Sequence, residues 1–219
     1  MELNRAICCR ELRESDVVGS DGEKIGRIGD MTFTFDGELK LSQFILSGPV
    51  FEEFLESIKV RPDKDPIFNG SMIKKMDEKV HLDTTKNGLK TTLDKGAIGE
   101  GEIRLSKLQK LAIIDKSGVS VGKAIDIDFD VDGSAKLIVG GGFFEEKLEA
   151  LGLKANVDII VPGKVIEKIG EKITLKVGKE ELALTMEEAI KTAAQSSAYE
   201  AKEANRQLSR VQLFTQRPM

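Results

Sequence analysis

Apolar and polar residues alternate along several short stretches of the chain. Residues 125–132, Ile-Asp-Ile-Asp-Phe-Asp-Val-Asp, place every apolar residue on one side of an extended segment. Residues 31–36, Met-Thr-Phe-Thr-Phe-Asp, show the same period of two. Each stretch predicts a β-strand with one buried and one solvated face. Asp21-Gly22 and Asp132-Gly133 predict hairpin turns, because glycine accepts the positive φ that tight turns need.

Further short elements complete a mainly β pattern. Residues 72–82 and 165–175 each predict a pair of short strands, and residues 52–58 and 145–151 each predict a helical turn or short helix. Turn signals recur about every ten residues. Many short strands separated in this way predict a small β-barrel, a closed sheet that leaves few open edges.

The chain contains two copies of one sequence pattern. Residues 17–26 align with residues 113–122 at a shift of 96, so that Gly22 meets Gly118 and Gly26 meets Gly122. The strand that follows continues the match with Asp30 and Asp126, Phe33 and Phe129, Asp36 and Asp132, Gly37 and Gly133, and Lys40-Leu41 and Lys136-Leu137. After a three-residue gap the shift becomes 93, from Phe51 and Phe144 through to Leu82 and Leu175. One short gap in about 80 residues indicates an internal duplication.

The duplication predicts two small domains of the same fold. We expect a first barrel at residues 12–93, a linker at residues 94–104 and a second barrel at residues 105–185. The linker is glycine-rich and acidic, which is typical of a solvated connection. Each copy is so small that packing between the copies, or a dimer, would add to its stability.

The sequence changes character at Thr185. Thr185-Met-Glu-Glu188 matches a capping box, and an Ala-, Glu- and Lys-rich stretch follows it. Small and apolar residues recur three or four positions apart from Met186 to Val211 and form one narrow stripe. We therefore expect a C-terminal helix at residues 186–213 and a short tail at residues 214–219. The predicted fold class is mainly β: two tandem small barrels followed by this helix.

Composition and charge exclude several functions. The net charge is −4, with 33 basic and 37 acidic residues mixed along the chain, so no nucleic-acid partner is expected. No apolar run approaches the ~20 residues of a membrane-spanning helix, so no direct membrane insertion is expected. The first residues lack the apolar segment of a secretory signal. Cys8 and Cys9 are adjacent and cannot form a disulfide framework, which favours the cytoplasm.

The repeated residues resemble the signature of the PRC-barrel family, named for the cytoplasmic barrel of the photosynthetic reaction centre H subunit. The pattern is a Val, then two glycines and an Asp at intervals of four, then a Phe-bearing strand that ends at Asp-Gly; in copy two Ile113 replaces the leading Val. It is matched by Gly22, Gly26 and Asp30 in copy one and by Gly118, Gly122 and Asp126 in copy two. The resemblance implies a module that docks proteins and performs no chemistry. Archaeal members with two such barrels are similar to cell-division proteins, which link a division scaffold to its membrane anchor or to filament-forming partners.

No catalytic, cofactor-binding or metal-binding residue is predicted. Asp128-x-Asp130-x-Asp132-Gly133 opens like a calcium-binding EF-hand loop, but Val139 stands where the loop needs a bidentate Glu, so a solvated strand face is expected. Gly140-Gly-Gly142 lacks the Gly-Lys-Ser/Thr of a phosphate loop. His81 is the only histidine, and no nucleophile motif accompanies it.

Two groups of apolar residues are candidate partner-binding positions. Phe51 and Phe143-Phe144 precede an acidic Glu-Glu pair in each copy, where they either close the barrel core or anchor a partner. Leu208, Val211 and Phe214 strengthen the apolar stripe near the C-terminus. That stripe can dock on the chain's own barrel, on a second copy or on another protein.

We expect a non-enzymatic adaptor that binds other proteins. The resemblance names the cell-division machinery as the expected partner, with recruitment to the division site through that partner, and a homodimer is a further candidate. One alternative is a ribosome-associated assembly or maturation factor, because a bacterial ribosome maturation factor carries a C-terminal domain of the same family. The other alternative is a small-ligand-binding domain protein.

Overall fold

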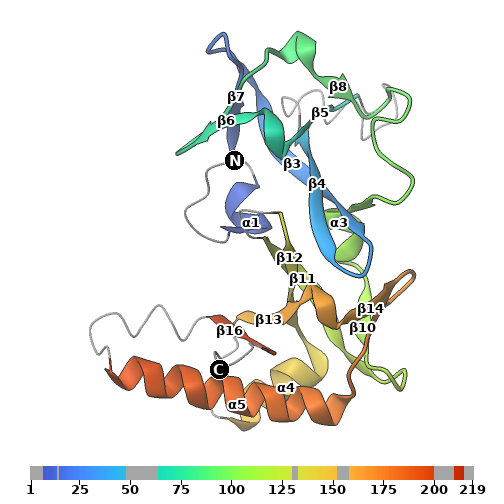
Figure 1. Cartoon of the computed structure of the whole chain (residues 1–219), viewed down its shortest axis with the longest axis vertical. Coiled ribbons are helices and arrows are strands. Elements are labelled where there is room, and N and C mark those ends of the chain that lie inside the picture. Colours follow the sequence, from blue (N-terminus) through green and yellow to red (C-terminus); the bar gives the residue numbers. More distant parts are fainter. Residues whose placement is uncertain are drawn as a thin grey trace. The chain divides into compact units, whose positions relative to one another are not determined.

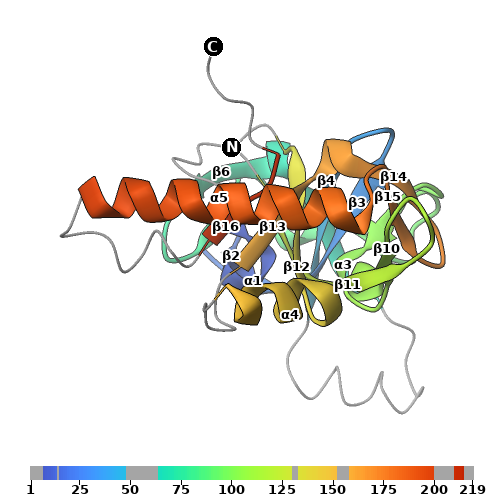
Figure 2. The same ribbon diagram turned by 90° about the horizontal axis from the view of Figure 1, so that it is seen from below.

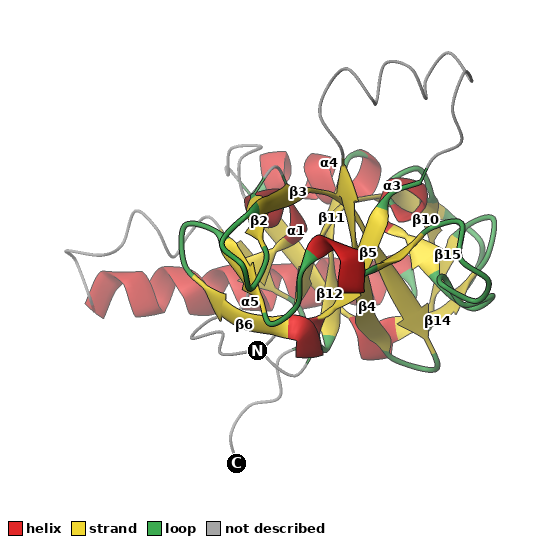
Figure 3. Ribbon diagram, turned by 90° about the horizontal axis from the view of Figure 1, so that it is seen from above, coloured by secondary structure: helices red, strands yellow, loops and turns green. Residues whose placement is uncertain are grey.

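The computed structural model of the chain describes residues 7–13, 15–47, 64–129, 133–151, 158–199 and 210–214. It is mainly β and has a C-terminal helix, as the sequence predicted, and its strands form two mixed sheets (Figures 1 and 3). The chain divides into two compact units. Unit 1 holds Met1–Phe35, Lys40–Lys107 and Phe129–Ser134, and unit 2 holds Asp36–Leu39, Leu108–Asp128 and Ala135–Met219.

The sheet of unit 1 runs in the order β6-β7-β2-β3-β4-β5-β8, and β9 pairs with β3. Strand β2 is parallel to β7, with Val17 opposite Val80, and antiparallel to β3. The strands of this sheet are β2 (Asp16–Val18), β3 (Lys24–Phe35), β4 (Leu39–Ser47), β5 (Pro66–Asn69), β6 (Ile73–Met76), β7 (Val80–Leu82), β8 (Lys90–Thr91) and β9 (Ile103–Arg104). Strand β1 (Ile7–Cys8) also belongs to unit 1 but lies outside this sheet. The helical turns are α1 (Cys9–Leu12), η1 (Gly70–Met72), η2 (Lys86–Gly88) and α3 (Leu105–Leu108).

Unit 2 repeats this strand order as β14-β15-β10-β11-β12-β13-β16. Strand β10 is again parallel to one neighbour, β15, with Ile113 opposite Ile173. The strands are β10 (Ala112–Ile114), β11 (Ser120–Phe129), β12 (Ala135–Gly140), β13 (Asp158–Pro162), β14 (Ile166–Ile169), β15 (Ile173–Leu175) and β16 (Arg210–Gln212). The helices are α4 (Gly142–Ala150), η3 (Gly163–Val165) and α5 (Lys179–Tyr199). The predicted strand pairs at 72–82 and 165–175 are thus confirmed, and α4 confirms the predicted helix near 145–151.

The strand pairing places the three-residue gap in the alignment of the two copies at a different position from the predicted one. Gln43 pairs with Asn69 in unit 1, and Lys136 pairs with Pro162 in unit 2. Asn69 and Pro162 are equivalent at a shift of 93, so Gln43 is the counterpart of Lys136. The predicted match of Lys40-Leu41 with Lys136-Leu137 is therefore wrong. The gap lies nearer the tip of the β3–β4 hairpin, where a change of length leaves the ladders undisturbed.

The two glycines of the repeated pattern have different structural roles. Gly22 and Gly118 adopt φ angles of +82° and +84° in the turns that follow β2 and β10, which confirms the turn predicted at Asp21-Gly22. Gly26 and Gly122 lie where the neighbouring strand comes close. A Cβ atom at either position would lie 2.8 Å from a backbone carbonyl oxygen, that of Ser47 or Gly140. The repeated glycines are therefore required by the fold.

Aromatic and aliphatic side chains fill the core of each sheet. In unit 1 the rings of Phe44 and Phe68 stack with centroids 4.9 Å apart. The predicted solvated face of residues 125–132 is wrong for its described part, because Asp126 and Asp128 are 2% and 3% exposed while Ile125 is 37% exposed. The alternation along β11 separates an apolar from a polar side, and both sides are largely covered.

The predicted linker packs onto the sheet of unit 1. Ala97 is buried in a small apolar cluster with Ile45 and Ile67. The Gln43 side-chain amide donates to the Ala97 carbonyl at 2.7 Å and to the Glu102 carboxylate at 3.0 Å. Residues 103–104 then pair with β3 as β9. The segment forms turns, and these contacts fix it in place on the sheet.

The predicted C-terminal helix at 186–213 is wrong at both ends. Helix α5 begins at Lys179, and Thr185 lies inside it, where its hydroxyl donates to the Glu181 carbonyl at 2.8 Å instead of capping the helix. Residues 210–212 form strand β16, parallel to β13. Val211 and Leu213 are buried and Gln212 is half-buried, a period of two that the helical spacing had concealed. Among the described helices, none is long and apolar enough to cross a membrane.

Candidate protein-interaction surface

The predicted partner-binding residues of the described segments are mostly covered. Phe143 and Phe144, at the start of α4, are buried, which favours their alternative role as core residues. Val211 is buried against its own unit, and Phe214 is half-buried. Phe51 and Leu208 lie outside the described residues. The surface that a partner could reach in unit 2 must therefore be sought on other side chains.

Helices α4 and α5 lie side by side on unit 2 (Figures 1 and 2). The Lys147 ammonium of α4 donates to the Glu187 carboxylate of α5 at 2.5 Å. This hydrogen bond, with the charge of Lys147, holds the pKa of Glu187 below its usual range. The Lys179 ammonium lies 5.1 Å from the ring centroid of Phe143, within the range of a cation–π contact. These pairs hold one side of α5 against its unit.

The N-terminus of α5 is capped by a residue from a distant turn. Asp115 follows β10, is 3% exposed, and accepts the Lys179 backbone N–H on Oδ2 at 3.0 Å. Its Oδ1 accepts the backbone N–H groups of Ser117 at 2.8 Å and Val119 at 2.9 Å. Burial raises the pKa of Asp115, but the backbone donors outweigh it, and the net pKa is below the usual value. We missed this cap because no Ser, Thr, Asp or Asn directly precedes Lys179, where a local cap would stand.

The opposite side of α5 is exposed and carries the candidate surface. Leu182 and Met186, four residues apart, are buried, and this orientation turns the intervening positions outward. We call the exposed set the α5 outer surface: Glu180, Glu181, Leu184, Glu188 and Lys191. Leu184 is 64% exposed, well above the usual exposure of a leucine, and three acidic groups flank it. An apolar side chain with an acidic rim is suited to contact an apolar residue beside basic groups on another protein.

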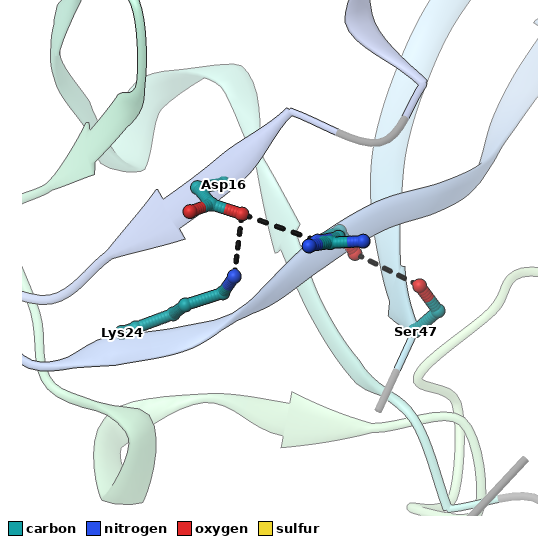
Figure 4. Close-up of polar contacts among 4 residues, drawn as sticks. Asp16, Lys24 and Ser47 are labelled. Carbon is teal, nitrogen blue, oxygen red and sulfur yellow. Dashed lines mark hydrogen bonds and ion pairs between the residues drawn. The ribbon is translucent and has the colours of Figure 1, made fainter. Parts of the chain in front are cut away.

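Unit 1 carries an exposed polar cluster on strands β2, β3 and β4 (Figure 4). The Asp16 carboxylate contacts the Lys24 ammonium at 2.6 Å and the Arg27 guanidinium at 3.3 Å. The hydrogen bond from Lys24 lowers the pKa of Asp16; desolvation opposes this effect, and the charges of Lys24 and Arg27 add to it. The Ser47 hydroxyl donates to the Arg27 carbonyl at 3.5 Å. The cluster joins β2, β3 and β4, three neighbouring strands in the middle of the sheet, so we assign it to the stability of the sheet.

The signature aspartate of copy one also serves the fold. Asp30 accepts the Ser106 backbone N–H at 3.2 Å and the Ser106 hydroxyl at 2.6 Å. Two residues after Asp30 on the same strand, the Thr32 hydroxyl donates a hydrogen bond to the Glu102 carboxylate. Both acidic groups thereby hold the segment around β9 and α3 onto β3.

The remaining candidates for chemistry are dispersed. His81 Nε2 lies 3.3 Å from Asp77, whose pKa is held well below its usual range, mainly by a hydrogen bond from Lys75. Cys8 and Cys9 are both buried thiols, and the Cys8 thiol donates to Glu11 at 3.0 Å. Within the part of the chain that the structure describes, no three His, Cys, Asp or Glu residues are grouped in a way that could hold a metal ion.

Calcium is expected not to bind at residues 126–132. Asp126 and Asp128 are buried on an extended strand, whereas a calcium loop curls its oxygen ligands around the ion. Asp130 and Asp132 lie outside the described residues. About 1 mM calcium should leave the melting temperature within about 1 °C of that in magnesium, measured by scanning calorimetry. Micromolar calcium affinity that is lost in D128N/D130N would contradict this expectation.

No family model matches the chain, and a search of curated proteins finds no match. Strand order, turn glycines and close-approach glycines nevertheless repeat between its two units. These observations define a mainly β protein built from a duplicated sheet, one copy of which is extended by a long helix.

Proposed function

We propose that this chain is a non-enzymatic adaptor that binds other proteins through two PRC-type barrels. The resemblance of its repeated residues to that family supports the proposal, and it points to archaeal cell division as the process served. In this proposal the protein is cytoplasmic and is recruited to the division site by a partner. The resemblance lies in the amino-acid sequence, and the duplicated sheet order is compatible with it.

One observation carries the adaptor proposal. The two copies share a sheet order, but only copy two is extended by α5 with its exposed Leu184. At the equivalent position, copy one makes the single turn η2 and then strand β8. The chain thus offers two related modules with different surfaces, as a protein that connects two different partners requires.

The process is tested in cells of the source organism. A fluorescent fusion of the full chain should concentrate at the division plane, and depletion of the chain should produce enlarged, undivided cells. Lysates fractionated on sucrose gradients test the ribosomal alternative in parallel. Uniform fluorescence together with co-sedimentation with a ribosomal subunit would overturn the cell-division proposal in favour of the assembly factor.

The α5 outer surface gives a residue-level prediction. Leu184→Glu should reduce capture of the division partner at least about tenfold, because one buried leucine contributes roughly 1.5–3 kcal/mol to an interface. The melting temperature should stay unchanged, since the side chain is already exposed. Val119→Glu is a matched control, because Val119 is 47% exposed in the turn between β10 and β11 of the same unit. Equal loss of capture in both variants would rule out a specific role for Leu184.

A further inference from the structure

The outer edge of β5 in unit 1 and of β13 in unit 2 is covered by an added strand in each case. In unit 1, β8 runs antiparallel to β5, with Pro66 opposite Thr91 and Ile67 opposite Lys90. In unit 2, β16 runs parallel to β13, with Ile159 opposite Val211 and Ile160 opposite Gln212. Pro66 and Ile67 are the counterparts of Ile159 and Ile160 at the shift of 93. The same edge positions therefore take a strand in either direction and from different parts of the chain.

The strand on β13 is held by main-chain bonds and two apolar side chains. The Leu213 backbone N–H donates to the Ile160 carbonyl at 2.9 Å. Val211 and Leu213 are buried, while Gln212 between them is half-buried. An added strand in which alternate side chains enter an apolar site is the geometry by which extended peptides bind to sheet edges. Residues 210–213 thus cover the edge of β13 as a bound peptide would.

We infer that the β13 edge is a strand-binding site of the adaptor, and that β16 is its resident, displaceable occupant. The partner it fits is an extended protein segment with apolar residues at alternate positions, as in Val211-Gln212-Leu213, running parallel to β13. This inference deepens the proposed adaptor function and rests on it. The resident strand is three residues long, lies at the edge of the sheet and is parallel, a pairing that is slightly less stable per residue than antiparallel pairing. These properties favour local release without unfolding of the sheet.

The resident strand also makes the site selective. Because β16 belongs to the same chain, it competes with a partner segment at a high effective concentration, of the order of millimolar for a short connection. A partner must therefore either bind more of the edge than β16 does or arrive where its local concentration is high. Release of β16 should strengthen binding of any matching segment.

A peptide-binding experiment tests this inference. The probe is a fluorescein-labelled peptide of residues 208–215, and the proteins are the full chain and its V211D/L213D variant, which places charges at the two buried positions of β16. We expect fluorescence anisotropy to show binding to the variant at least tenfold tighter than to the unsubstituted chain. The same peptide carrying Asp at both positions should not bind. A V119D variant, altered at an exposed position of unit 2 away from β13, should behave as the unsubstituted chain does.

Amide chemical shifts assign the site and verify the fold. A dispersed spectrum of V211D/L213D, with peptide-induced shifts at Ile159, Ile160 and Val161, supports the inference. No binding to a folded variant, equal affinity for the variant and the unsubstituted chain, or shifts confined to other residues would overturn it. Such a result would leave the cell localisation and the effect of Leu184→Glu untouched, so the two proposals fail separately.

Hydrogen exchange of the unsubstituted chain provides an independent test if the variant does not fold. The Leu213 amide should exchange at least tenfold faster than the hydrogen-bonded amides between β12 and β13, because release of β16 leaves that pairing intact. Equal protection at Leu213 and in the β12–β13 pairing would show that β16 leaves only when the unit unfolds. That result would overturn the inference.

Discussion

Replacing Gly122 by alanine should destabilise the protein by about 3 kcal/mol and lower its melting temperature by about 6–12 °C. Gly122 has a φ of +154°, a conformation that residues with a Cβ atom rarely adopt. A Cβ atom here would lie 2.8 Å from the Gly140 carbonyl oxygen and 2.8 Å from Cδ2 of Phe144. Because one neighbour is backbone and the other is a buried ring, neither can move without disturbing β12 or α4. Thermal and urea unfolding of the full chain measure the loss.

Two further glycine variants separate crowding from the loss of glycine itself. Gly26→Ala should destabilise less, because its Cβ would meet the Ser47 carbonyl at 2.8 Å but its φ is not in the region reserved for glycine. Gly170→Ala should be nearly neutral, since only the flexible end of Lys168 lies near, at 3.9 Å. If Gly122→Ala matched Gly170→Ala, the close approach would not be a requirement of the fold.

Local signals in the sequence predicted much of the fold. Turn glycines and short alternating strands are recognised from neighbouring residues, and the duplication is recognised because those local patterns recur. The structure contains all three. The exact position of the three-residue gap depends on which strands pair, and the ladders placed it elsewhere than the residue matches did. Strand pairing between distant residues leaves little trace in a single sequence. The identical pairs Lys40-Leu41 and Lys136-Leu137 therefore led to the wrong alignment.

The candidate surface was less predictable, because its elements are fixed by distant residues. Asp115 caps α5 from another turn, so the local capping box at Thr185 led to a predicted helix start seven residues too late. Strand β16 exists because the β13 edge accepts it, while Val211 equally fitted a helical stripe. Burial of Asp126 and Asp128 was hidden for a related reason, since alternation of polar and apolar residues does not reveal what covers the polar side.

The structure also extends the duplication beyond Leu82 and Leu175. Turn η2 begins at Lys86 and helix α5 at Lys179, which are equivalent at the shift of 93. Matching residues continue through the pairs Leu89 and Leu182, Thr92 and Thr185, and Leu93 and Met186. Copy one has Gly88 and Gly96 where copy two has Glu181 and Ala189. Each glycine in a helix interior costs about 1 kcal/mol relative to alanine, so the same pattern forms a helix only in copy two.

Asp115 should be the residue on which the attachment of α5 depends. Asp115→Ala removes all three backbone hydrogen bonds of the carboxylate, and we expect it to destabilise the protein by about 3 kcal/mol. Asp115→Asn separates the two roles of the side chain. Its remaining oxygen can still accept from Ser117 and Val119, while its NH₂ group faces the Lys179 N–H, where neither group can accept. We therefore expect Asn to keep the turn and to lose the helix cap, with a smaller loss of about 1–2 kcal/mol.

The stabilisation by Asp115 should depend on pH in a defined direction. Backbone donors hold its folded-state pKa below the usual value of about 3.9, so the folded protein favours the ionised form more than the unfolded chain does. The stabilisation is then fully present above about pH 5 and is lost as the pH falls through the lowered folded-state pKa. Glu187, Asp16, Asp77 and Asp94 also have lowered pKa values, so acid weakens the protein through several groups at once. The difference in unfolding free energy between the unsubstituted chain and Asp115→Asn isolates one of them: it should be constant from pH 5 to 8 and shrink below pH 4. A difference that stayed constant down to pH 2 would show that the charge of Asp115 does not contribute, and that its hydrogen bonds act as those of a neutral cap.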